Sequence, residues 1–313
     1  MLAALPLAAV GCAAPRSSES GVAGEDRDAA GPAHSGRGTD PDSPATTATR
    51  PRSDLPPAAR SARYLLLGEL HDNPHVHRLR LDWLHQLLAR TRFVLAMEQF
   101  DTSMQPQLDE ARKLHVHDGG TEQQRSHRLA QAAGFSFDGW DWPLYEPVVS
   151  FALRNGLTLV GANLSNADAS AVARGAAGAI DASAPAGWSA ADEASMQAAI
   201  RDGHCGLLPE SAVDGMMRAQ LARDRTMARV LYEAARRTRL PVVLLAGNGH
   251  VRADIGVPRH LAEFDREGPI VAIGMGEEQA PPDGRFDGFR SVEPVSRSDP
   301  CAALRERFGG VKR

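Results

Sequence analysis

The sequence predicts an α/β protein in which a mostly parallel sheet has helices on both faces. Short aliphatic runs alternate along the chain with longer segments of helical periodicity, and this order is typical of strands joined by crossover helices. The aliphatic runs are continuous rather than alternating, which indicates strands that are buried on both faces. With 313 residues, of which 42% are apolar, the chain is long enough to build a substantial core.

The expected strands and helices begin near residue 61. Five short apolar runs are expected to be strands: 63–67, 93–97, 157–160, 242–245 and 270–273. The first helix is expected to start at Asn73 and Pro74, a capping residue followed by a first-turn proline. Further helices are expected where apolar residues recur with helical spacing: 104–133 with an interruption at 117–120, 144–155 and 211–237. The small residues of 170–190 predict a loop or an insertion.

Charge and cysteine content exclude several classes of protein. The 35 basic and 39 acidic side chains give a net charge of −4, which provides no electrostatic reason to expect a nucleic-acid partner. The three cysteines are Cys12, Cys205 and Cys301, and no two of them form a CxxC pair. The chain is therefore neither a disulfide scaffold nor a carrier of a cysteine-based structural zinc site.

The amino terminus predicts an exported lipoprotein. Residues 1–11 are an apolar stretch that ends in small residues just before Cys12, and the stretch is too short to span a bilayer. We expect it to be a signal peptide, with Cys12 acylated as the first residue of the mature chain. Because Ala13 rather than Asp follows, we expect the outer membrane, with the protein facing the periplasm. The alternative is a disordered, Ala-rich leader with an incidental cysteine.

The segment 12–60 predicts a flexible tether between this anchor and a folded domain at 61–313. It contains mainly Ser, Thr, Pro, Gly, Ala and charged residues, which cannot bury enough surface to offset their conformational entropy. If Cys12 carries the lipid, Cys205 and Cys301 remain as a possible disulfide in an oxidising compartment. The sequence leaves open whether these two cysteines approach each other.

One short pattern occurs twice, each time after an aliphatic run. Gly68–His71 (GELH) follows the first expected strand, and Gly247–His250 (GNGH) follows the fourth. Glu98 stands at the end of the second expected strand. Because ligands bind in open parallel sheets beyond the carboxyl ends of the strands, we expect these residues to meet at one edge.

Glu69, His71, Glu98 and His250 are therefore the candidate site residues. Two imidazoles and two carboxylates are suitable ligands for a divalent transition metal, and a carboxylate with a histidine can equally serve as acid and base. The alternative is that these side chains only cap helices or satisfy backbone groups where loops begin.

Beyond these motifs, the chain resembles the ChaN-like haem-binding proteins of the Tiki and erythromycin-esterase-like superfamily. The resemblance covers residues 61–305 and rests on seven motifs in order: LLGELHDNP, LAMEQF, WDWPLYEPVVSFALRNGLTLVGANLS, GHCGLLPE, AQLARDRTMARVL, LLAGNGHVRADIGVP and SDPC. It implies an iron-regulated lipoprotein of haem uptake, with haem as ligand and a possible homodimer around it. It also implies that Glu69, His71, Glu98 and His250 occupy the family's site positions.

The haem ligand itself is left open by the resemblance. Tyr145 lies in a Trp-rich segment and is a candidate to line a flat porphyrin, although a core aromatic with a bonded hydroxyl is an alternative. Tyr64 and Tyr232 are expected at the start of a strand and within a helix. Trp140 and Trp142 are expected to belong to the core rather than to a cofactor site.

Other polar residues receive simpler interpretations. His75 and His77 are expected to be solvated in the first turn of a helix. The remaining candidates are possible metal-binding, nucleophilic or crevice residues: His115 and His117 in an HxH pattern, His204 beside Cys205, and Arg223 with Asp224, which alternatively form surface pairs.

Three functions are compatible with the sequence. The first is a haem-binding lipoprotein of iron uptake that acts as a carrier or receptor without catalysis. The alternative is a metal-dependent hydrolase of peptides or esters, in which Glu69, His71, Glu98 and His250 hold the metal and perform catalysis. The third is an envelope scaffold that has kept the fold and lost the site.

Overall fold

A computed structural model describes residues 54–115, 119–176, 178, 180–277, 285–299, 301–302 and 305–306. The predicted signal peptide, the acylated Cys12 and most of the predicted tether lie outside these residues. The folded part extends further toward the amino terminus than residue 61, because Leu55 is only 1% exposed and Pro57–Arg60 forms the 3-10 helix η1.

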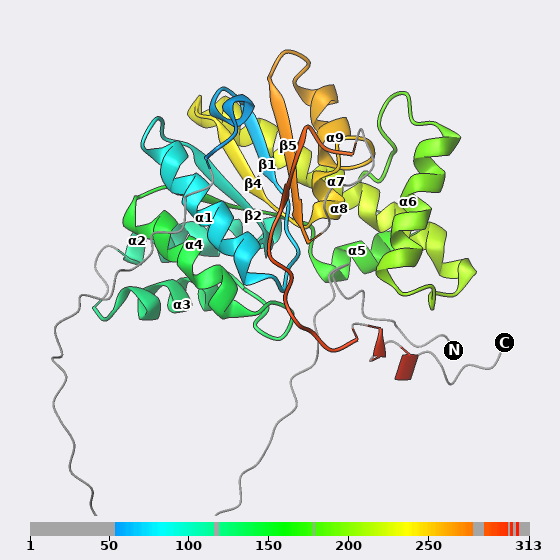
Figure 1. The fold of residues 1–313 in the computed structure, drawn as a ribbon, viewed down its shortest axis with the longest axis horizontal. Coiled ribbons are helices and arrows are strands. Elements are labelled where there is room, and N and C mark those ends of the chain that lie inside the picture. Colours follow the sequence, from blue (N-terminus) through cyan, green and yellow to red (C-terminus); the bar gives the residue numbers. More distant parts are fainter. Residues whose placement is uncertain are drawn as a thin grey trace, which may run out of the picture.

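The predicted fold class is confirmed. The structure contains a six-stranded sheet in the order β3-β2-β4-β1-β5-β6, and every neighbouring pair is parallel. The strands are β1 (Tyr64–Leu67), β2 (Val94–Asp101), β3 (Thr158–Asn163), β4 (Val242–Leu245), β5 (Ile270–Gly276) and β6 (Gly288–Ser291). Figure 1 shows helices on both faces of this sheet.

The helices are α1 (Pro74–Leu88), η2 (Thr102–Met104), α2 (Gln105–His115), α3 (Glu122–Ala132), α4 (Trp142–Arg154), α5 (Asn166–Ala173), α6 (Ala190–Gly203), α7 (Glu210–Thr238), α8 (Asn248–Val251) and α9 (Val257–Phe264). Of these, α1, α2, α3, α4 and α7 were expected from their apolar spacing. Asn73 caps α1 as predicted, since its side chain accepts hydrogen bonds from the backbone N–H groups of His75 and Val76. Within the described residues, no helix is both long and apolar enough to cross a membrane.

Alternate residues of each strand supply two separate cores. In β1, Leu65 and Leu67 pack with side chains of α1 and α4, whereas Leu66 packs with α7 and α9 on the other face. This division follows from the period of two along a strand. It also explains the continuous aliphatic runs, because both faces of the central strands are covered.

Two of the missed elements, β6 and α6, lack a strong apolar pattern, and the short helices α5, α8 and α9 were missed as well. β6, with the sequence GFRS, is a partly exposed edge strand without an aliphatic run. α6 buries only Met196 and Ile200, and its main signal is a capping box formed by Ser189 and Asp192. The small-residue segment that leads into α6 had suggested a loop, and the helix begins where that segment ends.

The register of the central strands sets the position of the site. Leu67 of β1 and Met97 of β2 both pair with Leu245 of β4, which lies between the other two strands. The residues that follow these three positions therefore lie at the same level of the sheet, although β2 itself continues to Asp101. Glu69, Glu98 and Gly247 thus come to one edge, as expected for the carboxyl ends of parallel strands.

Candidate functional site

Glu69 is the centre of a buried hydrogen-bond network. Its Oε1 is 2.6 Å from His71 Nδ1, accepts the Tyr145 hydroxyl proton at 2.7 Å and accepts from Gln99 Nε2 at 3.3 Å. Its Oε2 forms an ion pair with the Arg80 guanidinium, and the Glu69 side chain has no exposed surface. Burial alone would raise the pKa of Glu69, but the Arg80 charge and the His71 hydrogen bond outweigh it and hold the pKa well below its ordinary value.

His71 is held by one nitrogen and leaves the other open. Its Nδ1 faces Glu69, while no hydrogen bond to its Nε2 is found in the described part of the chain. The ring packs edge-on against Trp140 with 4.8 Å between centroids. Burial lowers the pKa of His71, but the hydrogen bond to Glu69 and the charges of Glu69 and Glu98 outweigh it, so the pKa lies above its ordinary value.

Gly247 makes room for the His71 ring. A β-carbon at this position would lie 2.9 Å from His71 Nε2 and 3.6 Å from Glu98 Oε2. The Gly247 N–H also donates to Glu98 Oε2 at 2.7 Å. The absence of a side chain at residue 247 therefore lets the first histidine, the carboxylate of Glu98 and the backbone before α8 come together.

His250 lies between two carboxylates. Its Nδ1 is 2.5 Å from Asp224 Oδ1 and its Nε2 is 3.4 Å from Glu98 Oε1. Burial lowers the pKa of His250, but the charges of Glu98 and Asp224 outweigh it and raise the pKa to about 10. Burial raises the pKa of Glu98, whereas the charge and hydrogen bond of His250 bring it down to about 2. At neutral pH the pair is therefore an imidazolium and a carboxylate.

The structure thus brings the predicted residues Glu69, His71, Glu98 and His250 to one edge. Glu98 connects the two histidines of the site. It faces His250 directly, and its charge stabilises a protonated His71. The sequence separation between the two histidines is bridged by the pairing of β1 and β2 with β4.

The predicted divalent-metal site is not supported. No group of three or more His, Cys, Asp or Glu side chains in the described residues is arranged to hold a metal ion. The physical reason is that the donor atoms already have partners: Glu69 faces Arg80 and Tyr145, and both nitrogens of His250 face carboxylates.

The aromatic candidates have distinct positions. Tyr145 has no exposed surface and its hydroxyl is bonded to Glu69, which matches the alternative of a core aromatic with a bonded hydroxyl. Tyr64 is also fully buried and donates to Asp265 Oδ2 at 2.8 Å, and Tyr232 stacks on Phe264. Trp140 and Trp142 pack against the core, as expected.

The interpretation of His77 as a solvated residue is wrong. His77 is 8% exposed, its Nε2 is 3.0 Å from the carbonyl oxygen of His71, and its Nδ1 is 2.9 Å from Arg80 Nη2. Burial and the Arg80 charge lower its pKa to about 4. His77 therefore holds the backbone of His71 as a neutral ring. His75, in contrast, is half-buried and contacts Arg78.

Two further interpretations are settled by geometry. Asp224 is fully buried against His250, and Arg223 is buried with a hydrogen bond to Asn163 Oδ1, so the surface-pair alternative is wrong for both. Cys205 forms a disulfide with Cys301, with Cα atoms 5.8 Å apart, which removes the Cys–His nucleophile from consideration. The HxH pattern falls on His117 and the side chain of His115, which lie outside the described residues.

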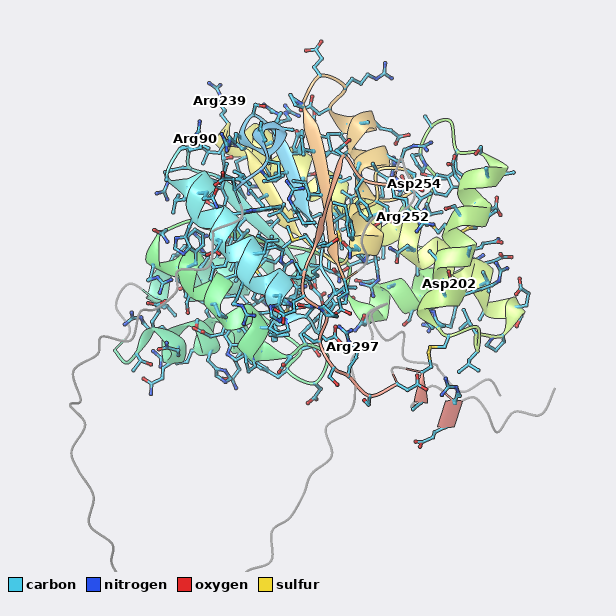
Figure 2. All side chains as sticks on the ribbon, viewed as in Figure 1. Arg90, Asp202, Arg239, Arg252, Asp254 and Arg297 are labelled. Carbon is cyan, nitrogen blue, oxygen red and sulfur yellow. A yellow bond between two sulfur atoms is a disulfide. The ribbon has the colours of Figure 1, made fainter. Side chains whose placement is uncertain are left out.

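The disulfide fastens a carboxyl-terminal segment beside the site. In this segment Arg297 Nε donates to Asp72 Oδ2 at 2.7 Å and Nη1 donates to Glu277 Oε2 at 2.8 Å. Asp72 directly follows His71 in the sequence. Figure 2 shows Arg297 at the lower edge of the fold, where the strands end.

Arg80 and Gln99 were missed, although Arg80 had a signal in the sequence. It occupies a position on the apolar stripe of α1, between Val76 and Trp83, both of which are fully buried. A charged residue at a buried position requires a partner, which is Glu69. Gln99 had no comparable signal, because β2 continues beyond its expected end.

With this geometry established, the chain can be compared with known proteins. The family model described as haem-binding uptake, Tiki superfamily, ChaN matches residues 56–261. The chain belongs to this ChaN family. No curated protein sequence matches the chain.

Solved structures add a likeness in fold. A structure of ChaN from Campylobacter jejuni with cofacially bound haem is 24% identical, with a TM-score of 0.61 over 72% of this chain and 86% of that one. An erythromycin esterase mutant in its open conformation is 16% identical, with a TM-score of 0.42 over 74% and 76%. The type III effector HopBA1 is 14% identical, with a TM-score of 0.43 over 75% and 90%.

Proposed function

We propose that this ChaN family member binds haem for uptake and that His71 is the axial ligand. The observation that carries the proposal is the open Nε2 of an imidazole whose Nδ1 faces a carboxylate. Histidines that ligate metals usually donate their other ring N–H to such a carboxylate, which fixes the ring and raises its basicity. Membership of a family of haem-binding uptake proteins supports haem as the molecule that is bound.

His71 and its neighbours suit axial ligation of haem better than Tyr145 or His250 does. Haem iron accepts a histidine nitrogen as axial ligand, and Trp140 provides an aromatic surface beside the ring. Because Glu69 holds the Nδ1 proton, the proton that leaves on ligation is the one on Nε2. Tyr145 and His250 would act indirectly, since the first holds Glu69 and the second holds Glu98.

We further propose that haem lies on an open face and that a second copy of the chain covers it. Cavities between α1 and α4 and beside α7 have volumes of about 150 and 220 Å³, below the ~300–1,000 Å³ of typical small-molecule pockets. A porphyrin face left in water would expose a large apolar surface. Sedimentation with and without haem tests this part, and an unchanged monomer would contradict it.

The proposed location is the cell envelope, with a lipid on Cys12 and an outer-membrane anchor that faces the periplasm. The apolar leader and the polar segment 12–60 support this proposal. A disulfide between Cys205 and Cys301 is compatible with an oxidising compartment. Mass spectrometry of the mature protein tests it, and an unmodified amino terminus would contradict it.

Haem titration tests the ligand directly. We expect a saturable Soret band with the unmodified protein. In His71→Ala the band should shift and lose intensity. His71→Gln provides a second variant in case the smaller side chain impairs folding, and circular dichroism checks both. His85→Ala is the matched control, because His85 is an exposed histidine near the other end of α1. Spectra of the His71 variants identical to that of the control would refute the assignment.

A hydrolase remains a second candidate, because the same geometry suits a general base. An imidazole oriented by a carboxylate and open at its other nitrogen can accept a proton from water or a hydroxyl group. In this version no metal is required, and the His250 imidazolium holds Glu98 as a carboxylate. Ester and peptide hydrolysis assays test it. Activity that survives in His71→Ala would contradict it.

A further inference from the structure

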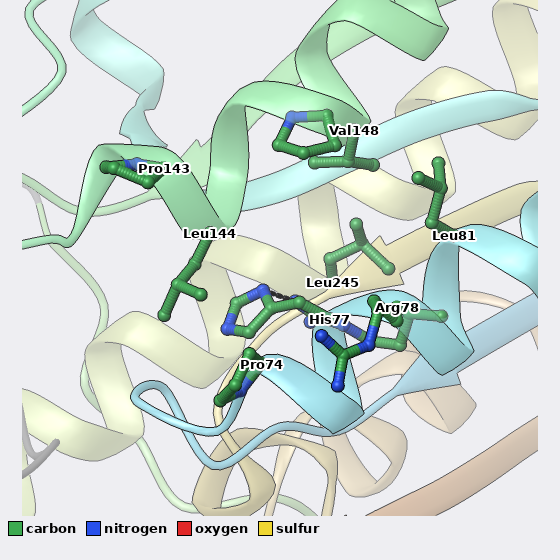
Figure 3. Close-up of a pocket in the computed structure, with 10 residues that line it drawn as sticks. Pro74, His77, Arg78, Leu81, Pro143, Leu144, Val148 and Leu245 are labelled. Atoms are coloured by element: carbon green, nitrogen blue, oxygen red, sulfur yellow. Dashed lines mark hydrogen bonds between the residues drawn. The ribbon is translucent and has the colours of Figure 1, made fainter. Parts of the chain in front are cut away.

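A cavity lies beside the site, between α1 and α4. Figure 3 shows Leu144 and Val148 of α4 on one side, Leu81 and Arg78 of α1 on the other, and Leu245 of β4 between them. Its volume is about 150 Å³, which is room for about five water-sized groups. The cavity therefore suits a small ligand with a mainly apolar body.

The polar side chains of this cavity favour an anion. Its ten lining residues include Arg78, Arg80 and His77 but no acidic side chain. Arg80 already faces Glu69, and both nitrogens of His77 have partners. Arg78 is exposed and contacts His75 Nδ1 at 2.8 Å, and no ion pair with a carboxylate is found for it in the described residues. One cation is thus left uncompensated at the mouth.

We propose that this cavity binds a carboxylate on a short aliphatic stem. The carboxylate pairs with the Arg78 guanidinium, which can bind both oxygens, and the stem packs against Leu144 and Val148. Two sources share this chemistry, namely a free short-chain carboxylate and a propionate arm of a porphyrin. The second source rests on the proposed haem function, whereas the first does not.

The cavity also shares two residues with the site. Arg80 lines it and pairs with Glu69, and His77 lines it and contacts the carbonyl of His71. A ligand between α1 and α4 therefore touches residues that contact Glu69 and the backbone of His71. Its arrival should be visible in the NMR signals of His71 as well as in those of the cavity.

Titration with sodium propionate at constant ionic strength tests the free ligand, with amide NMR of the full chain as readout. We expect saturable shifts in the first turns of α1 and α4, with a dissociation constant on the order of 1 mM. Propionamide, which lacks the charge, should produce no saturable shift. Equal shifts with propionate and propionamide would overturn the proposal. So would a failure of both propionate and haem to produce saturable shifts.

Three variants assign the contacts. Arg78→Gln should weaken binding about tenfold, the loss expected for one charge-assisted pair. Leu144→Trp fills the cavity, leaves Arg78 in place and should abolish binding. Arg90→Gln is the control, because Arg90 is exposed and Figure 2 shows it at the opposite edge of the fold. Unchanged binding in both Arg78→Gln and Leu144→Trp would also overturn the proposal.

Haem and its dimethyl ester distinguish the two sources. If the porphyrin arm is the ligand, esterification should weaken haem binding about tenfold in the unmodified protein. In Arg78→Gln, haem and its dimethyl ester should then bind with equal affinity. If the source is a free carboxylate, propionate binds and the ester binds as well as haem does. Absence of any Soret change refutes the haem function, while the propionate titration still decides the cavity.

Discussion

Replacing Arg80 with methionine removes the cation that Glu69 faces inside the protein. The two side chains are only 2% and 0% exposed, so Arg80→Met leaves a carboxylate that water cannot reach. Loss of one partner from a buried pair costs about 3–5 kcal/mol. His71, Tyr145 and Gln99 still bond to Glu69, so we expect about 3 kcal/mol, from a typical total of about 5–15 kcal/mol.

Urea unfolding, followed by circular dichroism at pH 7, measures this loss. The pKa of Glu69 is lowered in the folded protein, so its contribution to stability is present above its unfolded pKa of about 4.3 and is lost as pH falls through the folded value. Arg80→Met should forfeit this contribution. The difference between the two proteins should therefore stay constant from pH 7 down to about pH 4.3 and narrow only as pH falls further.

Two comparisons make the result decisive. Arg90→Met removes an exposed arginine just beyond α1 and should change the free energy of unfolding by less than about 0.5 kcal/mol. The double variant with Glu69→Gln should lose less than the sum of the two single losses, because it leaves neither charge alone. An Arg80→Met protein as stable as the Arg90→Met protein would refute the reasoning.

Gly247→Ala places a methyl group 2.9 Å from the His71 ring and should cost about 1–3 kcal/mol in urea unfolding. Gly249→Ala is its control, since nothing lies within 4 Å of a β-carbon there, and equal losses would contradict the packing argument. The raised pKa of His250, about 10, predicts a contribution to stability that is complete below about pH 6.5 and lost as pH rises toward 10. Asp224→Asn should flatten that decline, and an unchanged pH profile would count against the pairing. Cys205→Ser should lower stability by about 2–5 kcal/mol and make it insensitive to reductant, and a variant that still responds to reductant would disprove the bond's contribution.

The central strands were predictable because each one is marked by a short run of aliphatic residues in the sequence. The runs at 63–67 and 242–245 are aliphatic throughout, and such runs form strands that are covered on both faces. The meeting of Glu69 with Glu98 followed from the rule that parallel strands end at one edge. The order of the strands, with β4 between β1 and β2, and the edge strand β6 were beyond the sequence pattern.

The partners of the site residues were less predictable, since they come from helices that pack from elsewhere in the chain. Asp224 lies on α7 and meets His250 only because α7 crosses the sheet there. His77 looked like a first-turn surface residue, and its burial depends on how α1 packs against α4. The metal interpretation failed for the same reason, because Arg80 occupies the carboxylate that a metal would need.

Nitrogen NMR of the imidazole rings can decide whether His71 presents an open Nε2. Spectra would be recorded with and without one equivalent of gallium protoporphyrin, a diamagnetic substitute for haem. We expect the His71 Nε2 signal to shift on binding, while both nitrogens of His250, held by Asp224 and Glu98, keep their imidazolium signals. A His71 signal that stays fixed while the porphyrin binds would contradict the proposed ligand.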